Sequence, residues 1–266
     1  MSWIDSHCHL KSFYQKKVLD VVLRRAMLSG VEKMITVGTN KSDWSLYQSL
    51  SQQYLKTVFY TVGLHPCYVD DNWVSELEGF SGFWSLSPSP VALGEIGLDY
   101  FRLPKNIAQA EKIRNLQKEC FSFQLGVASD LGCPVIIHAR NAFDDCVRLI
   151  DESGLDWSNV VFHCFSEGMD EIEKLINRGG YASFTAIVSY KNNDQIRSAL
   201  KKQGIDRLML ETDSPYLPVN QGEKKANEPS AVPLIGESVS LTLEKSVEDL
   251  ACKTTSLAQS FFSLYN

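Results

Sequence analysis

Short apolar runs rich in β-branched residues alternate with longer amphipathic segments along nearly the whole chain. Strands that are covered on both faces are apolar throughout, so these runs are typical of a buried parallel sheet. The predicted strands are Trp3–Ile4, Met34–Val37, Thr57–Val62, Pro90–Leu93, Pro134–Ile137, Val160–Phe162, Tyr181–Phe184 and Leu208–Leu210. The pattern therefore predicts eight strands.

Helix-like segments with apolar residues three and four positions apart separate these strands. The predicted helices cover 16–29, 42–54, 74–83, 106–131, 142–151, 170–178 and 194–203. Eight strands with seven crossovers, followed by a helical tail over 232–262, favour a parallel (β/α)8 TIM barrel over an open doubly wound sheet. Because no linker, repeat or low-complexity segment divides the sequence, we expect a single domain over residues 1–266.

The composition excludes several classes of protein. The chain has 266 residues, of which 44% are hydrophobic and 22% charged, so it can bury one large core. Its net charge of −6 argues against a surface that holds duplex nucleic acid tightly by counterion release. The seven cysteines show no CxxC spacing, so neither a disulfide framework nor a thiolate zinc site is expected. Without an export signal or a long apolar run, we expect a cytoplasmic protein with no membrane contact.

The end of the first predicted strand carries a pattern suited to metal binding. Asp5, His7 and His9 occupy alternate positions, which directs their side chains to one face and that of Cys8 to the other. Two imidazoles at this separation can reach one divalent cation, and the flanking carboxylate can bind the cation or orient the rings. In isolation, the same pattern also fits a polar strand end with surface histidines.

An acidic residue follows the fourth predicted strand directly. Glu95 lies in the segment Gly94–Tyr100, where a buried carboxylate is costly unless it is paired or coordinated. Its useful role there is to bridge two cations. Taken alone, the segment is equally compatible with a turn that carries a solvated glutamate.

Three further strand ends each carry one candidate, namely His138, His163 and Asp213. Alone, each histidine is compatible with a structural role, and an aspartate before Ser-Pro is an ordinary turn residue. Together with the earlier groups they place imidazoles and carboxylates at one end of five strands, which is the end where barrels have their active sites. We therefore predict one or two divalent metal ions, with ligands that suit zinc, manganese and magnesium alike.

The chain resembles the TatD-like metal-dependent nucleases of the amidohydrolase superfamily over essentially its whole length. The likeness is carried by Asp5–His9, Gly63–Pro66, Gly94–Tyr100, Pro134–Arg140, His163–Ser166, Glu211–Tyr216 and Asn227–Pro229. The resemblance implies a distorted TIM barrel, hydrolysis of phosphodiester bonds in DNA, and His65 near the scissile phosphate. The metal ligands that it implies are His7, His9, Glu95, His138, His163 and Asp213.

Two positions depart from the family's pattern. Glu167 stands between the His-Cys-Phe-Ser segment and Gly168, where the family usually continues directly with glycine. Cys67 stands where the family often has histidine after Gly-x-His-Pro. Because every expected metal ligand is present, these departures bear on substrate preference rather than on catalysis.

The candidate residues suggest distinct roles in hydrolysis. The first cation is expected between His7, His9, Glu95 and Asp213, and the second between Glu95, His138 and His163, with Glu95 as the bridge. Asp213 can accept the proton of the attacking water. His65 and Arg140 are candidates for holding the phosphate, and a salt bridge to a rim carboxylate is nearly as compatible with Arg140.

The expected partner is DNA, bound transiently through its phosphates at single-stranded ends, and no obligate protein partner is implied. Four cationic side chains can guide a strand end, and three aromatic side chains can stack on bases. They are Arg102, Lys191, Lys224 and Lys225, and Tyr100, Phe101 and Tyr216. Solvated surface for the cations, and packing for the rings, are the simpler interpretations of each residue alone.

The strongest alternative function is hydrolysis of a carbonyl ester or amide, as in an aminoacyl-ester hydrolase, a lactonase or an amidase. The same metal centre can activate water against a carbonyl carbon. Against this alternative, the bridging position is Glu95 and not the carboxylated lysine of many amidohydrolases. A binding protein with a vestigial site is disfavoured because no ligand position has been lost.

Overall fold

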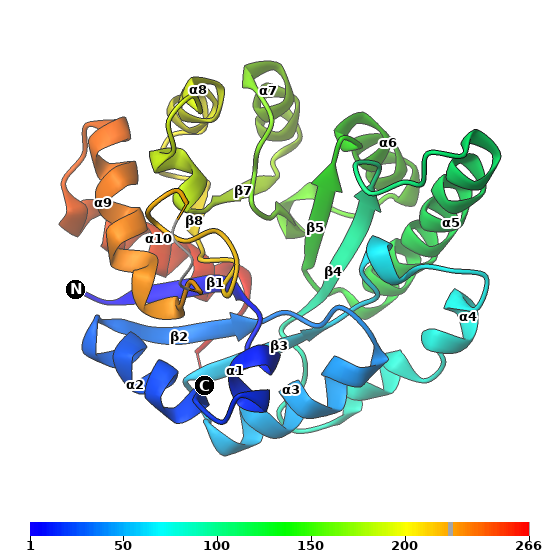
Figure 1. Cartoon of the computed structure of the whole chain (residues 1–266), viewed down its shortest axis with the longest axis horizontal. Coiled ribbons are helices and arrows are strands. Elements are labelled where there is room, and N and C mark those ends of the chain that lie inside the picture. Colours follow the sequence, from blue (N-terminus) through cyan, green and yellow to red (C-terminus); the bar gives the residue numbers. More distant parts are fainter. Residues whose placement is uncertain (223–225, 266) are drawn as a thin grey trace.

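Eight parallel strands form one sheet in the order β1 to β8, and the sheet curls into a nearly closed barrel with helices outside it (Figure 1). This computed structural model describes residues 1–222 and 226–265, so Lys224 and Lys225 lie outside the described residues. The strands are β1 (Trp3–Cys8), β2 (Val31–Thr36), β3 (Val58–Val62), β4 (Ala92–Asp99), β5 (Val135–Arg140), β6 (Val160–Phe162), β7 (Tyr181–Phe184) and β8 (Leu208–Leu210). The predicted TIM barrel is confirmed.

The helices follow the predicted crossovers closely. They are α1 (Lys11–Gln15), α2 (Leu19–Leu28), α3 (Lys41–Gln53), α4 (Trp73–Glu76), α5 (Ile107–Leu131), α6 (Phe143–Ser153), α7 (Met169–Arg178), α8 (Asp194–Gln203), α9 (Val232–Leu243) and α10 (Val247–Phe261). The prediction missed α1, and the helix expected over 74–83 is divided into α4 and a 3-10 turn at Phe80–Ser85. Gly79 between them has a φ of 75°, a left-handed conformation that ends a helix.

Alternation along the strands separates two apolar layers. The inner cluster fills the barrel with Ile4, Ile35, Val37, Ala92, Ile136, Val161 and Met209. Ala258, Phe262 and Leu264 belong to the same cluster, so the end of α10 and the residues after it close the floor of the barrel. Residues of the opposite parity pack against the surrounding helices. Polar groups are therefore left to the carboxyl ends of the strands.

The seam between β8 and β1 closes the barrel through the site segments themselves. The amide of Asp213 donates to the carbonyl of His7 at 2.9 Å, and the amide of His9 donates to the carbonyl of Ser214 at 2.7 Å. An isolated parallel bridge joins Cys8 to Ser214. These bonds set both histidines of the first strand beside Asp213.

Two strands shift register where they carry candidate ligands. β1 shifts against β2 between Asp5 and Cys8, and β4 shifts against β5 between Leu93 and Ile96. An irregularity of this kind re-aims side chains, which is why bulges are common beside active sites. Glu95 therefore lies within β4 and not after it, which corrects the sequence-based placement. In the described part of the chain, no helix is both long enough and apolar enough to cross a membrane.

Candidate metal centre

A cavity of about 600 Å³ opens at the carboxyl ends of the strands. Seven of the predicted site residues line it, namely His9, His65, Glu95, His138, Arg140, His163 and Asp213. The eighth, His7, is fully buried, and its Nε2 lies 3.5 Å from Glu95 Oε2. The fold thus brings all eight residues to one place, although the first and the last of them, His7 and Asp213, are 206 residues apart in the sequence.

The side chains of His7, His9, Glu95 and Asp213 converge on one point. The Nε2 atoms of His7 and His9 are 3.3 Å apart, and Asp213 Oδ1 lies 3.7 and 3.3 Å from them. Glu95 Oε2 lies 3.5 and 3.8 Å from the same two nitrogens. Atoms that bind zinc at about 2.0–2.1 Å in a tetrahedron are about 3.3 Å from one another. The five separations, from 3.3 to 3.8 Å, are close to this value and suit side chains that share one divalent ion.

A second group of nitrogen atoms meets the other oxygen of Glu95. Oε1 lies 2.7 Å from His163 Nε2 and 2.8 Å from His138 Nδ1, and these two nitrogens are 3.2 Å apart. His65 Nε2 lies 3.3 Å from the same oxygen. The two carboxylate oxygens of Glu95 thus face two separate sets of imidazoles, which is the arrangement needed in a bridging ligand.

Neighbouring acceptors orient the imidazoles of the first and second groups. His9 Nδ1 is 3.2 Å from the carbonyl oxygen of Val37, and His138 Nε2 is 3.3 Å from Asp99 Oδ2. An acceptor on one ring nitrogen holds the proton there and leaves the lone pair of the other nitrogen for a metal ion. In both rings that other nitrogen is the one directed at the centre.

Asp5 supports the centre from within the seam and does not line the cavity. Its carboxylate accepts hydrogen bonds from the amide and hydroxyl of Thr212, at 2.9 and 2.6 Å, and from the amide of His7 at 3.3 Å. Burial raises the pKa of Asp5 to about 8. Of the two roles that the sequence allowed, the geometry favours orientation, exerted through the backbone.

The electrostatics of the centre keep its carboxylates ionised. Burial acts to raise the pKa of Glu95, but the charges of His163 and His65 and bonds from His138 and His163 hold it well below its usual value. The pKa of Asp213 is also lowered, since its bond to His9 and the charges of the neighbouring histidines together outweigh burial. Burial lowers the pKa of His65 to about 4. Buried carboxylates surrounded by imidazoles are a donor set for a cation.

The two candidates for phosphate binding, His65 and Arg140, both line the cavity. The guanidinium of Arg140 stacks on the ring of Phe101, 3.9 Å from its centroid. In the described residues Arg140 forms no ion pair with a carboxylate, so the salt bridge that the sequence also allowed is absent there. His65 Nδ1 accepts a hydrogen bond from the amide of Cys67 at 3.0 Å, which places the proton of a neutral ring on Nε2.

The two departures from the family's pattern have different surroundings. Cys67 Sγ lies 3.5 Å from Asp99 Oδ2 and accepts a hydrogen bond from Arg102 at 3.4 Å, so it contacts the carboxylate that holds His138. Glu167 is half-buried and does not line the cavity. Burial raises its pKa, as do the nearby charges of Glu171 and Asp144. Glu167 therefore does not place its charge at the entry.

The predicted rim residues separate into two kinds. Phe101 and Tyr216 are 59% and 61% exposed, and Tyr216 lines the cavity together with Arg102. Tyr100 is a packing residue, since it donates a hydrogen bond to Asp145 at 2.7 Å and packs against the core. Lys191 is exposed and lies outside the cavity lining.

Two buried acids near the centre were assigned no role from the sequence. Asp99 contacts His138 at 3.3 Å, and Glu211 lies 3.4 Å from His163 Nδ1. Both stand in the motif segments quoted above, and Glu211 precedes Asp213 by two positions, the inward period of a strand. That spacing is the signal that was available for Glu211.

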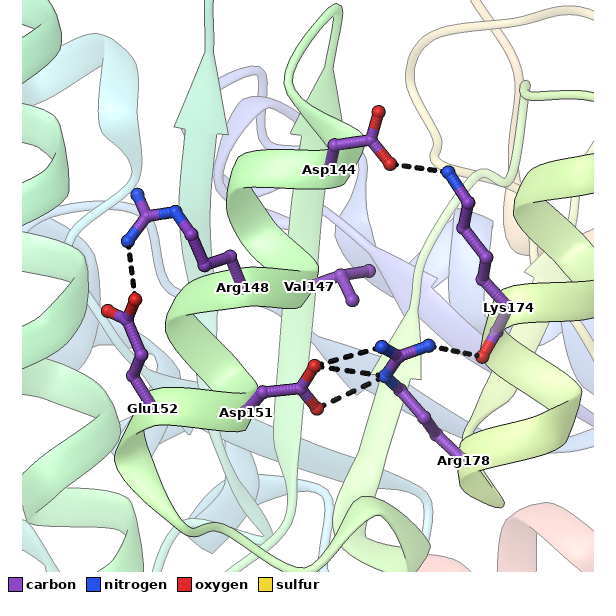
Figure 2. A pocket seen from close by; sticks show the side chains of 7 residues that line it. All are labelled: Asp144, Val147, Arg148, Asp151, Glu152, Lys174 and Arg178. Atoms are coloured by element: carbon purple, nitrogen blue, oxygen red, sulfur yellow. Dashed lines mark hydrogen bonds and ion pairs between the residues drawn. The ribbon is translucent and has the colours of Figure 1, made fainter.

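A second hollow lies on the outer surface between α6 and α7 and has a volume of about 500 Å³ (Figure 2). Its charged side chains pair with one another, as in Asp144 with Lys174 at 2.7 Å and Asp151 with Arg178 at 3.0 Å. No histidine lines it. The charged side chains of this hollow neutralise one another, whereas the barrel mouth gathers the imidazoles and carboxylates of the candidate metal centre.

Proteins similar to this chain include metal-dependent hydrolases and a nuclease. The family model described as TatD related DNase matches residues 4–263. The uncharacterized metal-dependent hydrolase YcfH of Escherichia coli K12 is 34% identical over 259 residues, covering 96% of this chain and 93% of YcfH. The 3'-5' ssDNA/RNA exonuclease TatD of Erwinia amylovora is 30% identical, covering 98% and 99% of the two chains. The crystal structure of the TatD homologue YjjV from Escherichia coli superposes with a TM-score of 0.88 at 25% identity, with 98% of each chain covered. The chain therefore belongs to the TatD family of metal-dependent hydrolases.

Proposed function

We propose that this protein is a two-metal phosphodiesterase that removes nucleotides from single-stranded ends of DNA. The observation that carries the proposal is the placement of Glu95 between two sets of imidazoles, one oxygen toward each, beneath an open cavity. The relative from Erwinia amylovora that is named as an exonuclease on single-stranded DNA and RNA supports the choice of substrate.

The residues of the centre have the chemistry to hold two divalent ions. His7, His9 and Asp213 supply one group of donors, and His138 and His163 the other, with Glu95 shared. Zinc, manganese and magnesium each remain compatible with these donors. Bound ions supply two effects: they lower the pKa of water and neutralise charge on phosphate oxygens.

Asp213 is proposed as the acceptor of the proton from the attacking water. Its pKa lies below the ordinary value because of its bond to His9, so the side chain is a carboxylate at neutral pH and can take a proton. Its Oδ1 points at the centre, 3.3 Å from His9 Nε2. Glu95 would be shared by the two ions, and the charges of His163 and His65 with the bonds from His138 and His163 hold its pKa below the ordinary value.

Arg140 and His65 are proposed to hold the phosphate. The planar guanidinium of Arg140 offers paired donors that suit phosphate oxygens, and its stacking on Phe101 restricts its orientation. The exposed rings of Phe101 and Tyr216 offer flat surfaces for bases next to the scissile bond. These contacts are few, in keeping with transient binding by a protein of net charge −6.

A labelled-DNA assay tests this function. Single-stranded DNA labelled at the 3′ or the 5′ end is incubated with wild-type protein and magnesium, manganese or zinc, and with EDTA. We expect metal-dependent release of nucleotides, abolished by EDTA and lowered at least about 100-fold by Asp213→Asn, because general-base catalysis contributes about 10²–10⁴-fold. Asp145→Asn, which changes a partly buried acid of α6 that does not line the cavity, is the control and retains activity.

Equal digestion by wild type and Asp213→Asn contradicts the proposed role of Asp213. If neither digests DNA while the wild type cleaves a carbonyl ester or amide in the presence of metal, the substrate is of the alternative class. The two results are separate, since the first concerns the proton acceptor and the second the substrate.

A further inference from the structure

Glu211 is a buried acid beneath the metal centre that the proposed mechanism does not use. It follows β8 directly, is 1% exposed, and does not line the cavity. A carboxylate at such a depth is costly unless several donors compensate it. Its contacts therefore indicate what it is for.

Donors from two neighbouring strands hold the carboxylate in place. The amide of Cys164, the residue after His163, donates to Oε1 at 2.7 Å. The hydroxyl of Ser183 in β7 donates to Oε2. Because both oxygens are engaged by groups with fixed positions, Glu211 has one well-defined orientation.

Among the described residues, one ring nitrogen on each of two ligand histidines is buried and has no hydrogen-bond partner. They are Nδ1 of His7 and Nδ1 of His163. His163 Nδ1 lies 3.4 Å from Glu211 Oε1, and one ligand atom each of His7, His163 and Glu211 fall within 4.8 Å of one another. The two rings stack in parallel, with centroids 4.0 Å apart and planes at 13°. One carboxylate thus lies beside two stacked imidazoles.

These two rings belong to different ligand groups. His7 Nε2 faces the group with His9 and Asp213, whereas His163 Nε2 faces the group with His138. We propose that Glu211 is a positioning residue that keeps the protons of both rings on Nδ1 and thereby presents both Nε2 lone pairs to the centre. A hydrogen-bond acceptor beside Nδ1 favours the tautomer that carries its proton there.

The consequence is that Glu211 couples the two metal positions. A change at an ordinary supporting residue such as Asp99 touches one ring, His138, and acts on one group of ligands. A change at Glu211 acts on one ligand of each group. The inference rests on the proposed two-metal centre but not on the choice of DNA as substrate.

The test compares metal binding by Glu211→Gln and wild type, without reference to activity. Both proteins are stripped of metal and titrated with cobalt(II), and binding is followed by calorimetry and by the visible absorption of the bound ion. We expect Glu211→Gln to weaken both binding steps by about 10–100-fold, the usual effect of removing a partner of a metal-binding histidine, and to shift the absorption spectrum. Asp145→Asn is the control, since Asp145 is likewise an acid held by several donors, Tyr100, Lys118 and Arg148, but lies outside the barrel mouth.

Wild-type affinity for both ions and an unchanged spectrum in folded Glu211→Gln would overturn the inference. Loss of one binding step alone would overturn the coupling. If Glu211→Gln does not fold, Ser183→Ala carries the test, because it removes one donor that fixes the carboxylate. We expect it to weaken both steps several-fold, and unchanged affinities would overturn the inference. Wild type that binds two ions but leaves DNA intact rejects the proposed substrate alone.

Discussion

At the scale of single residues, the centre depends on where protons and backbone atoms are placed. Gly97 shows the backbone side of this requirement. Its φ is 138°, and a Cβ added there would lie 2.0 Å from the carbonyl oxygen of His138. The close approach of β4 to β5 at this point holds Glu95 next to His138, and a residue larger than glycine has no space there.

Replacing Gly97 by alanine should therefore destabilise the protein. We expect the free energy of unfolding to fall by about 1–3 kcal/mol, the usual cost of overpacking, with a loss of metal affinity as the strands separate. Denaturant unfolding and metal titration measure the two effects. Gly126→Ala is the control, since Gly126 lies in α5 with nothing within 4 Å of the added atom. A Gly97→Ala protein as stable as wild type would contradict the close approach.

Asp99 illustrates how the centre depends on the placement of a proton, here on the ring of His138. It is held by Arg102 and Cys67 and lies 3.3 Å from His138 Nε2. We expect Asp99→Asn to weaken one metal-binding step by about 10–100-fold while leaving the other close to wild type. Titration of stripped protein with zinc measures both steps. Two equally weakened steps would show that Asp99 does not act through His138 alone.

At the scale of elements, α5 connects the loops on either side of the centre. Gln124 donates to and accepts from the backbone of Leu64, at 3.1 and 2.8 Å, next to His65. Two turns earlier on the same helix, Gln117 accepts a hydrogen bond from the amide of Asp99 at 3.0 Å and donates one to the carbonyl of Pro66 at 3.2 Å. The helix thus fixes both the loop of His65 and the end of β4.

Removing one of these amides should cost stability through the backbone groups that it leaves unpaired. We expect Gln124→Leu to lower the free energy of unfolding by about 1–3 kcal/mol, since both backbone groups of Leu64 are buried there. Denaturant unfolding measures the change. The exposed Gln109, on the first turn of α5, provides the control, and Gln109→Leu should differ from wild type by less than about 0.5 kcal/mol.

The link between α5 and α6 should depend on pH through Asp145. Its carboxylate accepts bonds from Lys118, Tyr100 and Arg148, which outweigh burial and lower its pKa to about 2. A lowered pKa in the folded state adds stability above the unfolded value near pH 4, and this contribution is lost as pH falls toward 2. The stability difference between wild type and Asp145→Asn should therefore shrink across that window. A difference that is constant from pH 5 to pH 2 would contradict the assigned contacts.

The elements were largely predictable from the sequence, but the placement of side chains at the bulges was not. All eight strands follow from apolar runs, because burial on both faces leaves a local signature. The register shifts at 5–8 and 93–96 depend on how neighbouring strands fit, which no local pattern encodes. The sequence places Glu211 in a motif segment but does not reveal its contacts with His163 and Ser183. Those contacts depend on how the closed barrel brings neighbouring strands together.

At the scale of the whole molecule, the apolar floor and the candidate metal centre lie at opposite ends of the barrel. The floor is apolar and closed by Phe262 and Leu264, whereas the mouth gathers buried carboxylates and imidazoles. An ion that binds the folded barrel and not the unfolded chain stabilises the whole fold by mass action. Metal should therefore be a structural ligand as well as a catalytic one.

Removal of metal should lower thermal stability. We expect EDTA to reduce the free energy of unfolding by about 2.7 kcal/mol relative to a sample that holds free metal at 100 times its Kd. Scanning calorimetry with and without EDTA measures this change. Glu95→Gln lacks the shared ligand and should respond much less to EDTA. A wild-type melting temperature that does not change with metal would contradict this linkage.

The bridging position of Glu95 is tested most directly by anomalous diffraction from crystals grown with manganese. We predict two anomalous peaks, one on each side of the Glu95 carboxylate, the first near His7, His9 and Asp213 and the second near His138 and His163. Peaks that lie away from Glu95, or none in a crystal whose protein hydrolyses DNA, would contradict the two-metal centre.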